Sequence, residues 1–204
     1  MYEDEVALIE GMVAGRDDAY RAAIRTYQSS MRYLAASLVG EKIADEVVQE
    51  AWFSALRAIG KFERRSTLKT WLLRIFANEG KTRLRKENRL RSLDEMLAAD
   101  PEMLSRFDDT GHWQPGPHVW TEDSQDALIA RDELKACMQQ LIETLPDMQS
   151  ATLNLRENQG YSLAEICNIL EVSESNVRVL LHRARQRLFR CIEHFQATGK
   201  CCTS

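Results

Sequence analysis

Glycine and proline are scarce in this chain of 204 residues, which contains nine glycines and four prolines. Three of the four prolines (Pro101, Pro115 and Pro117) lie in one stretch, so most of the remaining chain lacks strong helix breakers. Apolar side chains recur there at spacings of three and four residues, and no convincing strand-like alternation is present. These absences predict an all-α fold.

Long apolar runs are also missing. No stretch approaches the ~18–20 residues that cross a bilayer, and the N-terminus begins with acidic residues rather than with a secretory signal. The five cysteines are an odd number, and their spacing is not that of a secreted disulfide framework. We therefore expect a cytoplasmic protein that does not insert into a membrane.

Motifs typical of enzymes are absent as well. The sequence contains no metalloprotease helix motif, no phosphate-binding loop and no nucleophile elbow. An enzyme is therefore the least favoured class of function.

The net charge of −4 is an average over blocks of opposite sign. Residues 81–91 carry six basic side chains against the lone acid Glu87, and residues 178–190 carry five arginines and no acid. Acidic residues gather at the N-terminus and in residues 94–126. The two basic blocks indicate two phosphate-facing surfaces, although a solvated helix face explains either block taken alone equally well.

Composition divides the chain into two helical domains and a linker. Residues 1–92 and residues 124–197 carry the apolar helical patterns of the two small domains. Residues 93–123 are acidic and hold most of the prolines, so they are expected to form a flexible linker. Residues 198–204 form a tail that contains cysteine.

Residues 162–190 have the pattern of a helix-turn-helix. Ser162 and Glu165 have the spacing of a capping box, in which each side chain satisfies a free backbone donor. Glu171 and Val172 form the turn, and Ser173 caps the second helix. The outward face of that helix is basic and polar, and its N-terminal half suits the major groove. An ordinary helical hairpin is the alternative for these features alone.

Residues 160–188 resemble region 4 of bacterial RNA polymerase sigma factors. Upstream, residues 45–53 resemble region 2.2 of the same family, and residues 62–78 resemble region 2.3 and its continuation. The order and spacing of these motifs resemble the small extracytoplasmic-function (ECF, group IV) sigma factors over nearly the whole chain except the linker and tail.

The resemblance implies a DNA-binding initiation subunit without catalytic residues or an established cofactor. Such a protein binds the β′ and β subunits of core RNA polymerase and directs promoter-specific transcription initiation. It recognises the −35 and −10 elements, melts the DNA and is commonly held inactive by an anti-sigma factor. The residues that the resemblance assigns to core polymerase binding are Asp45, Val48, Gln49 and Trp52. Trp52 suits the core equally well.

The resemblance also implies where the two promoter elements bind. An unstacked −10 base would be read by Asn78, beside aromatic and cationic groups that hold a single strand. The residues expected at the −10 element are Phe62, Arg64, Arg65, Lys69, Arg74, Asn78, Lys81, Arg83, Arg85 and Lys86. Those expected at the −35 element are Ser173, Ser175, Asn176, Arg178, Val179, His182, Arg183 and Arg185.

One position departs from the pattern of the family. Sigma factors of this kind usually have glycine at the turn of the helix-turn-helix, where this chain has Glu171. Either Glu171 adopts a left-handed conformation at a cost of roughly 1–2 kcal/mol, or the turn is altered. Val179 and His182 are weak readers of bases, so the −35 sequence does not follow from them.

The tail has several interpretations. Cys191 and His194 share a helix face, and Cys201 and Cys202 can fold back toward them. These four ligands suit zinc or copper, and the thiols suit redox sensing. Adjacent cysteines are awkward for one tetrahedral site, so unpaired thiols in a frayed C-terminus remain an alternative.

The acidic linker has two interpretations. It either mimics nucleic acid in the basic channel of the polymerase or acts as a solvated tether. The acids concerned are Asp100, Glu102, Asp108 and Asp109.

A transcriptional regulator that binds DNA alone is the second functional hypothesis. It gives no reason for the motif at residues 45–53, nor for aromatic side chains beside the cations of residues 64–86.

Overall fold

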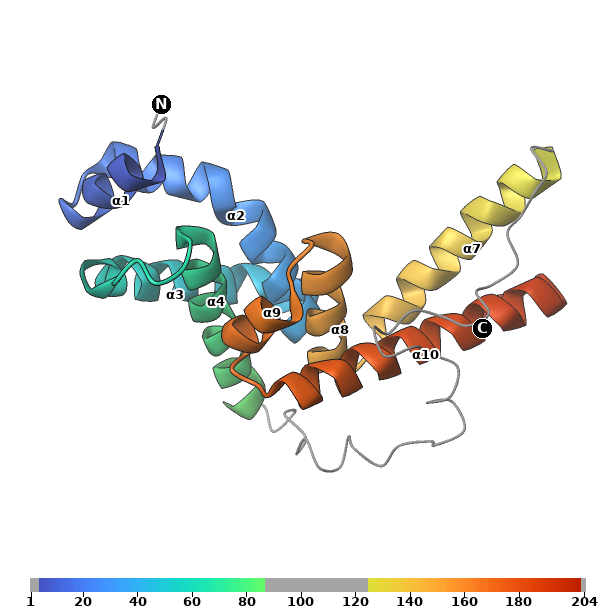
Figure 1. Cartoon of the computed structure of the whole chain (residues 1–204). Coiled ribbons are helices and arrows are strands. Elements are labelled where there is room, and N and C mark those ends of the chain that lie inside the picture. Colours follow the sequence, from blue (N-terminus) through green and yellow to red (C-terminus); the bar gives the residue numbers. More distant parts are fainter. Residues whose placement is uncertain (1–3, 87–124, 203–204) are drawn as a thin grey trace. The chain divides into compact units, whose positions relative to one another are not determined.

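The computed structural model describes residues 4–86 and 125–202, so the expected linker and its acids lie outside the described residues. Every regular element in these two ranges is helical, which confirms the all-α prediction (Figure 1). None of the helices in them has the length and apolarity needed to cross a membrane.

The first helices of the chain build one compact core. They are α1 (Glu5–Val13), α2 (Asp17–Val39), α3 (Glu41–Ala58) and α4 (Leu68–Lys86), with a 3-10 turn at Ile59–Lys61. Helices α2, α3 and α4 pack against one another, and α1 packs on α2 (Figure 1). Apolar residues three and four apart meet in this core because that spacing places them on one helix face. The large side chains of Met31, Leu34, Leu72 and Phe76 are fully buried.

Helices α2 and α4 approach closely at Gly80. A Cβ atom built on Gly80 would lie 2.9 Å from Leu38 Cδ1 and 3.3 Å from Leu38 Cβ. Leu38 is itself fully buried. The absence of a side chain at Gly80 therefore lets α4 lie against α2 where a larger residue would push them apart.

Thr67 caps the start of α4. The backbone N–H of Thr70 donates to Thr67 Oγ1 at 3.2 Å, which satisfies one of the free donors of the first turn. A second donor comes from Leu68, whose N–H meets Glu5 Oε1 of α1 at 3.1 Å. The first turn of α4 is thus held both locally and by α1.

The later helices are α7 (Gln125–Glu143), α8 (Asp147–Leu153), α9 (Leu163–Leu170) and α10 (Glu174–Thr198). A π-helical turn at Asn154–Asn158 follows α8. Leu153 of α8, Ala184 of α10 and Leu145, which lies between α7 and α8, form a small hydrophobic core. Ile142 and Leu188 pack against this core, so α7 and α10 are tied together by apolar contacts.

Contacts between Cα atoms group the chain into two compact units. Among the described residues, unit 1 contains α1 to α4, the π-helical turn and α9, and unit 2 contains α7, α8 and α10 from Ser175 onward. This grouping follows packing and not chain order, because unit 1 contains α9 together with the first four helices of the chain. The domain boundaries inferred from the sequence therefore stay a prediction.

Candidate nucleic-acid interface

The motif at residues 45–53 lies on α3, which exposes polar residues of the motif and buries apolar ones. Asp45 and Gln49 are exposed, whereas Val48 and Trp52 are 6% and 7% exposed. The Trp52 ring meets the Phe76 ring edge-on, with 5.4 Å between centroids. Trp52 is thus part of the core. Asp45 and Gln49 remain accessible to a partner on α3.

Phe53 extends this exposed line, and the sequence reasoning did not include it among the site residues. It lies four residues after Gln49, so the two side chains project from the same side of the helix. Its side chain is 54% exposed, which is unusual for a large aromatic residue. The spacing of Asp45, Gln49 and Phe53 was the signal that could have found it.

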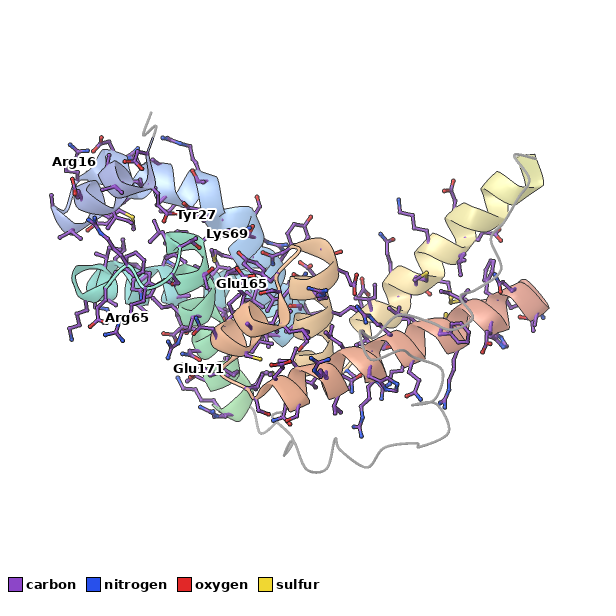
Figure 2. All side chains as sticks on the ribbon, in the orientation of Figure 1. Arg16, Tyr27, Arg65, Lys69, Glu165 and Glu171 are labelled. Atoms are coloured by element: carbon purple, nitrogen blue, oxygen red, sulfur yellow. A yellow bond between two sulfur atoms is a disulfide. The ribbon has the colours of Figure 1, made fainter. Side chains whose placement is uncertain are left out.

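The segment before α4 holds an aromatic pair beside two arginines. Phe62 and Trp71 are both half-buried, and their rings lie 5.0 Å apart in a tilted arrangement. Arg64 has a positive φ of 57° and pairs with Glu10 at 3.5 Å. Arg65 is exposed and pairs with Glu63 at 2.8 Å (Figure 2). Aromatic rings beside cations provide the chemistry that single-stranded DNA requires.

Helix α4 presents cations along its length with different degrees of exposure. Arg74, Arg85 and Lys86 are exposed, and Lys69 and Arg83 are half-buried. Exposed arginine and lysine side chains are suited to phosphate contacts.

Several of the residues expected at the −10 element contact α9 or the residues that flank it, which belong to the same compact unit as α4. Arg74 Nε donates to Glu171 Oε1 at 2.7 Å, and the Lys69 ammonium lies 5.3 Å from the centre of the Tyr161 ring. Asn78, which is half-buried, hydrogen-bonds to Glu171 through its side chain. With Lys81, described next, Glu171 contacts three of the residues that the sequence assigned to DNA.

Lys81 is the one cation of this set that the structure buries. Its side chain donates to the carbonyl oxygen of Leu170 at 3.0 Å and lies 3.7 Å from Glu171 Oε2. Burial lowers the pKa of the Lys81 ammonium, and the nearby Glu171 carboxylate partly opposes that shift. In this arrangement the Lys81 charge is used within the unit rather than offered to solvent.

Helix α9 begins with the predicted capping box. Ser162 Oγ accepts from the Glu165 backbone N–H at 3.3 Å, and Glu165 Oε2 accepts from the Ser162 backbone N–H at 2.9 Å. The hydrogen bonds from Ser162 lower the pKa of the Glu165 carboxyl because they stabilise its charged form. The reciprocal pair that the sequence indicated is confirmed.

Helix α9 ends at Leu170, and the next residue, Glu171, caps it with φ 51° and ψ 48°. Of the two alternatives for the turn, Glu171 therefore adopts the left-handed conformation in place of the usual glycine. The Glu171 backbone N–H donates to Cys167 O, which closes the helix end. The turn keeps its geometry, and Glu171 carries the conformational cost that a glycine would avoid.

Helix α10 starts directly after Ser173 and runs to Thr198. Ser173, Ser175 and Arg178 are exposed on its first turns. The remaining residues assigned to the −35 element are half-buried: Asn176, Val179, His182, Arg183 and Arg185. The buried face contains Val177, Leu180, Leu181 and Ala184, as the periodicity predicted.

The tail cysteines meet a partner that the sequence reasoning did not select. Cys191, Cys201 and Cys202 gather with Cys137 of α7, and their four sulfur atoms lie within 4.8 Å of one another. His194 is exposed and is not part of this group. The predicted set of three cysteines and His194 is therefore replaced by four cysteines, because packing of α7 on α10 brings in Cys137.

Comparison with known proteins identifies the two motif-bearing parts of the chain. Residues 23–90 match the family model described as Sigma-70 region 2, and residues 135–188 match Sigma-70, region 4. Together these matches span more than half of the chain.

Curated relatives extend the match. A probable RNA polymerase sigma factor of Haemophilus influenzae is 31% identical over 150 residues, which cover 74% of this chain and 77% of that protein. The ECF RNA polymerase sigma-E factor of the same organism is 28% identical over 182 residues, covering 89% of this chain and 92% of the relative.

A solved structure shares the fold. It is that of the sigma factor RpoE in complex with the anti-sigma factor NepR from Bartonella quintana. The TM-score is 0.55 at 21% identity, with 85% of this chain and 96% of that chain covered.

Sigma factors are DNA-binding initiation subunits that associate with core RNA polymerase and promoter DNA, and they are not themselves catalysts. Both family matches, the identity with the curated relatives and the confirmed helix-turn-helix elements agree. The chain belongs to the sigma-70 family of RNA polymerase sigma factors, and within it to the extracytoplasmic-function group.

Proposed function

We propose that this sigma factor docks on the β′ subunit of core polymerase in the cytoplasm through the exposed line of Asp45, Gln49 and Phe53 on α3. The observation that carries this assignment is the separation on α3 between those exposed residues and the buried Val48 and Trp52. Aromatic side chains are enriched at protein interfaces, and a carboxylate and an amide beside Phe53 supply hydrogen bonds at its rim.

The same proposal assigns the −10 element to α4 and the segment before it. The Phe62–Trp71 pair offers an aromatic surface for an unstacked base, and Arg65 lies on the loop beside it. Asn78 offers an amide that matches the edge of a flipped base. Because Asn78 and Arg74 contact Glu171, binding of the −10 strand requires these two side chains to exchange Glu171 for DNA.

The −35 element is assigned to the first turns of α10. Ser175 and Arg178 are exposed there, and Asn176 lies between them. Arginine and asparagine pair with guanine and adenine edges in the major groove. Each phosphate contact that is removed should reduce the salt dependence of DNA binding by about 0.9 in the log–log slope.

Control by an anti-sigma factor is part of the same proposal. The solved sigma factor RpoE that shares this fold is in complex with the anti-sigma factor NepR. A partner of this kind from the source cell should inhibit run-off transcription in proportion to its binding.

Run-off transcription tests the whole assignment. Core polymerase with this protein should start transcripts at defined positions on a promoter library, and core polymerase alone should not. An absence of promoter-dependent initiation would contradict the assignment and favour a regulator that binds DNA alone.

Two matched variants separate docking from folding. Phe53→Ala should weaken binding to core polymerase with little change in the melting temperature, because its ring is 54% exposed. Val13→Ala is the control, since Val13 is an apolar residue of similar exposure, 55%, that lies on α1 outside the docking line. Equal loss of polymerase binding in both variants would contradict the docking line.

A further inference from the structure

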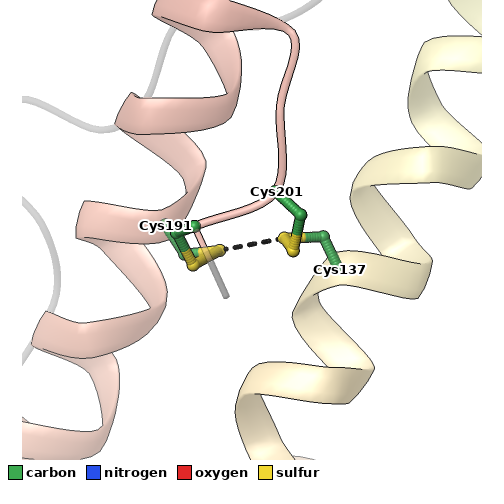
Figure 3. A group of neighbouring side chains, drawn as sticks. Cys137, Cys191 and Cys201 are labelled. Carbon is green, nitrogen blue, oxygen red and sulfur yellow. Dashed lines mark hydrogen bonds between the residues drawn. A yellow bond between two sulfur atoms is a disulfide. The ribbon is translucent and has the colours of Figure 1, made fainter. Parts of the chain in front are cut away.

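Four cysteines from three separate segments meet at one point in unit 2. Cys137 comes from α7, Cys191 from α10 and Cys201 from the tail that follows α10 (Figure 3). Cys202 is the next residue of the tail. Their four Sγ atoms all lie within 4.8 Å of one another. Cys137 and Cys191 are 3% and 1% exposed, so the centre of the group is protected from solvent.

The chain is shaped to bring the tail back to the helices. Helix α10 ends at Thr198, and Gly199 has a φ of 66°, the left-handed conformation that commonly terminates a helix. The Gly199 backbone N–H donates to Phe195 O at 2.8 Å, and the Lys200 N–H donates to Thr198 Oγ1 at 3.2 Å. The tail is therefore a defined reversal rather than a frayed end, and it places Cys201 beside α7.

In the structure the sulfurs are joined as Cys137–Cys201 and Cys191–Cys202, with Cα–Cα distances of 5.4 and 5.3 Å. The two pairs are also in contact with each other, because Cys137 Sγ lies 3.3 Å from Cys191 Sγ (Figure 3). A disulfide requires only that its own two cysteines meet, and it places no demand on a second pair. The mutual approach of all four sulfurs therefore calls for a separate explanation.

A tetrahedral metal–thiolate centre supplies that explanation. Zinc bound by thiolates has metal–sulfur distances of about 2.3 Å, which place the sulfurs about 3.8 Å from one another. Four sulfurs within 4.8 Å of one another already lie close to this arrangement. The adjacent pair Cys201 and Cys202 can both contribute because one approaches Cys137 and the other approaches Cys191.

We propose that the reduced protein binds one Zn²⁺ ion through Cys137, Cys191, Cys201 and Cys202. Four thiolates without a carboxylate or water form the closed ligand set of structural zinc sites. A sigma factor that acts with RNA polymerase works where thiols are kept reduced, and clustered cysteines in such proteins bind metal more often than they form lasting disulfides.

The chemistry of loading balances in two steps. A thiol reductant of the glutathione class supplies four electrons and four protons to the two disulfides, giving four thiols and two oxidised reductant disulfides. Zn²⁺ then replaces the four thiol protons, which are released to solvent, and no electron is transferred to or from the metal.

The metal would join α7, the tail and the C-terminal half of α10. The apolar contact between α7 and α10 is made where Ile142 of α7 and Leu188 of α10 pack against the group of Leu145, Leu153 and Ala184. A structural zinc ion would add a cross-link about one helical turn from Ile142 and Leu188. It would thereby hold in place the helix whose first turns are assigned to the −35 element.

Metal content of the reduced full-length protein tests the proposal without DNA or polymerase. Protein purified without air and with zinc chloride present should retain about one zinc ion per chain after gel filtration. Replacement with Co²⁺ should produce the intense visible absorption of a tetrahedral tetrathiolate centre. These readouts do not depend on transcription, so their failure is distinct from failure of the proposed function.

Three variants define the ligand set. Cys202→Ser should lower the zinc content and alter the Co²⁺ spectrum, and because Cys202 is exposed the variant should keep its helical circular dichroism. Cys167→Ser is the matched control, since Cys167 is a free cysteine on α9 outside the group. His194→Ala should also retain zinc, which separates this site from a set that includes His194.

Two outcomes would overturn the zinc site. One is reduced wild-type protein with no more zinc than the Cys202→Ser variant. The other is recovery of the Cys137–Cys201 and Cys191–Cys202 disulfides from cells whose thiols were alkylated at lysis, which would make the group a pair of lasting disulfides.

Discussion

Arg32 of α2 holds Asp45 of α3 through a hydrogen bond of 2.8 Å between Arg32 Nε and Asp45 Oδ1. The same guanidinium donates from Nη2 to Glu41 Oε2 at 2.8 Å. The hydrogen bonds to Asp45 and Glu41 raise the pKa of Arg32 because they stabilise its charged form. Asp45 is thus oriented by α2 before any partner binds, which reduces the side-chain entropy that docking must remove.

Asp45→Asn should weaken binding to core polymerase while changing stability little, because exposed ion pairs contribute at most about 1 kcal/mol. Glu41→Gln is the comparison, since it alters the other carboxylate on Arg32, one turn before Asp45 on α3, and leaves the Asp45 carboxylate in place. Fluorescence anisotropy with labelled protein measures both affinities. If the two variants weaken binding equally, the effect arises from the Arg32 network rather than from contact of Asp45 with the polymerase.

Gly80→Ala should destabilise the protein. The new methyl group would gain up to about 1 kcal/mol of helix propensity, but overpacking against a buried side chain costs about 1–3 kcal/mol. The clash is with Leu38, 2.9 Å from the added Cβ. Urea unfolding should show a lower midpoint for Gly80→Ala, and a larger drop for Gly80→Val.

Gly60→Ala is the matched control, because nothing lies within 4 Å of a Cβ built there. It should leave the midpoint unchanged or slightly raised. A Gly80→Ala protein as stable as the wild type would show that α2 and α4 do not pack as closely as the structure indicates.

The capping box of α9 should make stability depend on acid. Hydrogen bonds from Ser162 lower the pKa of Glu165 in the folded protein. A carboxyl with a lowered folded pKa contributes stability above its unfolded pKa, and this contribution is lost as the pH falls through the folded value. Thermal unfolding measured from neutral pH into the acid range should therefore show a loss that is smaller in Glu165→Gln.

Ser162→Ala removes the acceptor at the N-cap and should cost about 1 kcal/mol at neutral pH. It should also reduce the acid dependence that Glu165 contributes, because the Ser162 hydroxyl that accepts from the Glu165 N–H also donates to Glu165 Oε2 at 2.7 Å. An unchanged acid dependence in both variants would place its origin in other carboxyl groups.

The left-handed conformation of Glu171 should be measurable as strain. Glu171→Gln removes the charge that pairs with Arg74 but keeps the side chain, whereas Glu171→Gly removes both. Glycine relieves about 1–2 kcal/mol of left-handed strain but adds unfolded-chain entropy, so E171G should be more stable than E171Q by about 0.5–1 kcal/mol. Chemical unfolding of the two variants measures this difference, and a more stable E171Q would contradict it.

The sequence by itself determined the features that depend on near neighbours. The helical periodicity predicted the buried face of α10, and the spacing of Ser162 and Glu165 predicted the capping box, because such effects act within about one helical turn. The motifs also placed the chain in its family before any packing was known. The missing glycine at Glu171 pointed to a strained or altered turn, but its geometry required the structure.

Tertiary structure decided the features that join residues distant in sequence. Cys137 enters the cysteine group from 64 positions before Cys201, and His194 stays outside it although it shares a helix with Cys191. Burial of Lys81 and exposure of Phe53 follow from which helices pack against α4 and α3. Such pairings depend on the choice among many compact arrangements of the same helices, and local spacing rules do not distinguish between these arrangements.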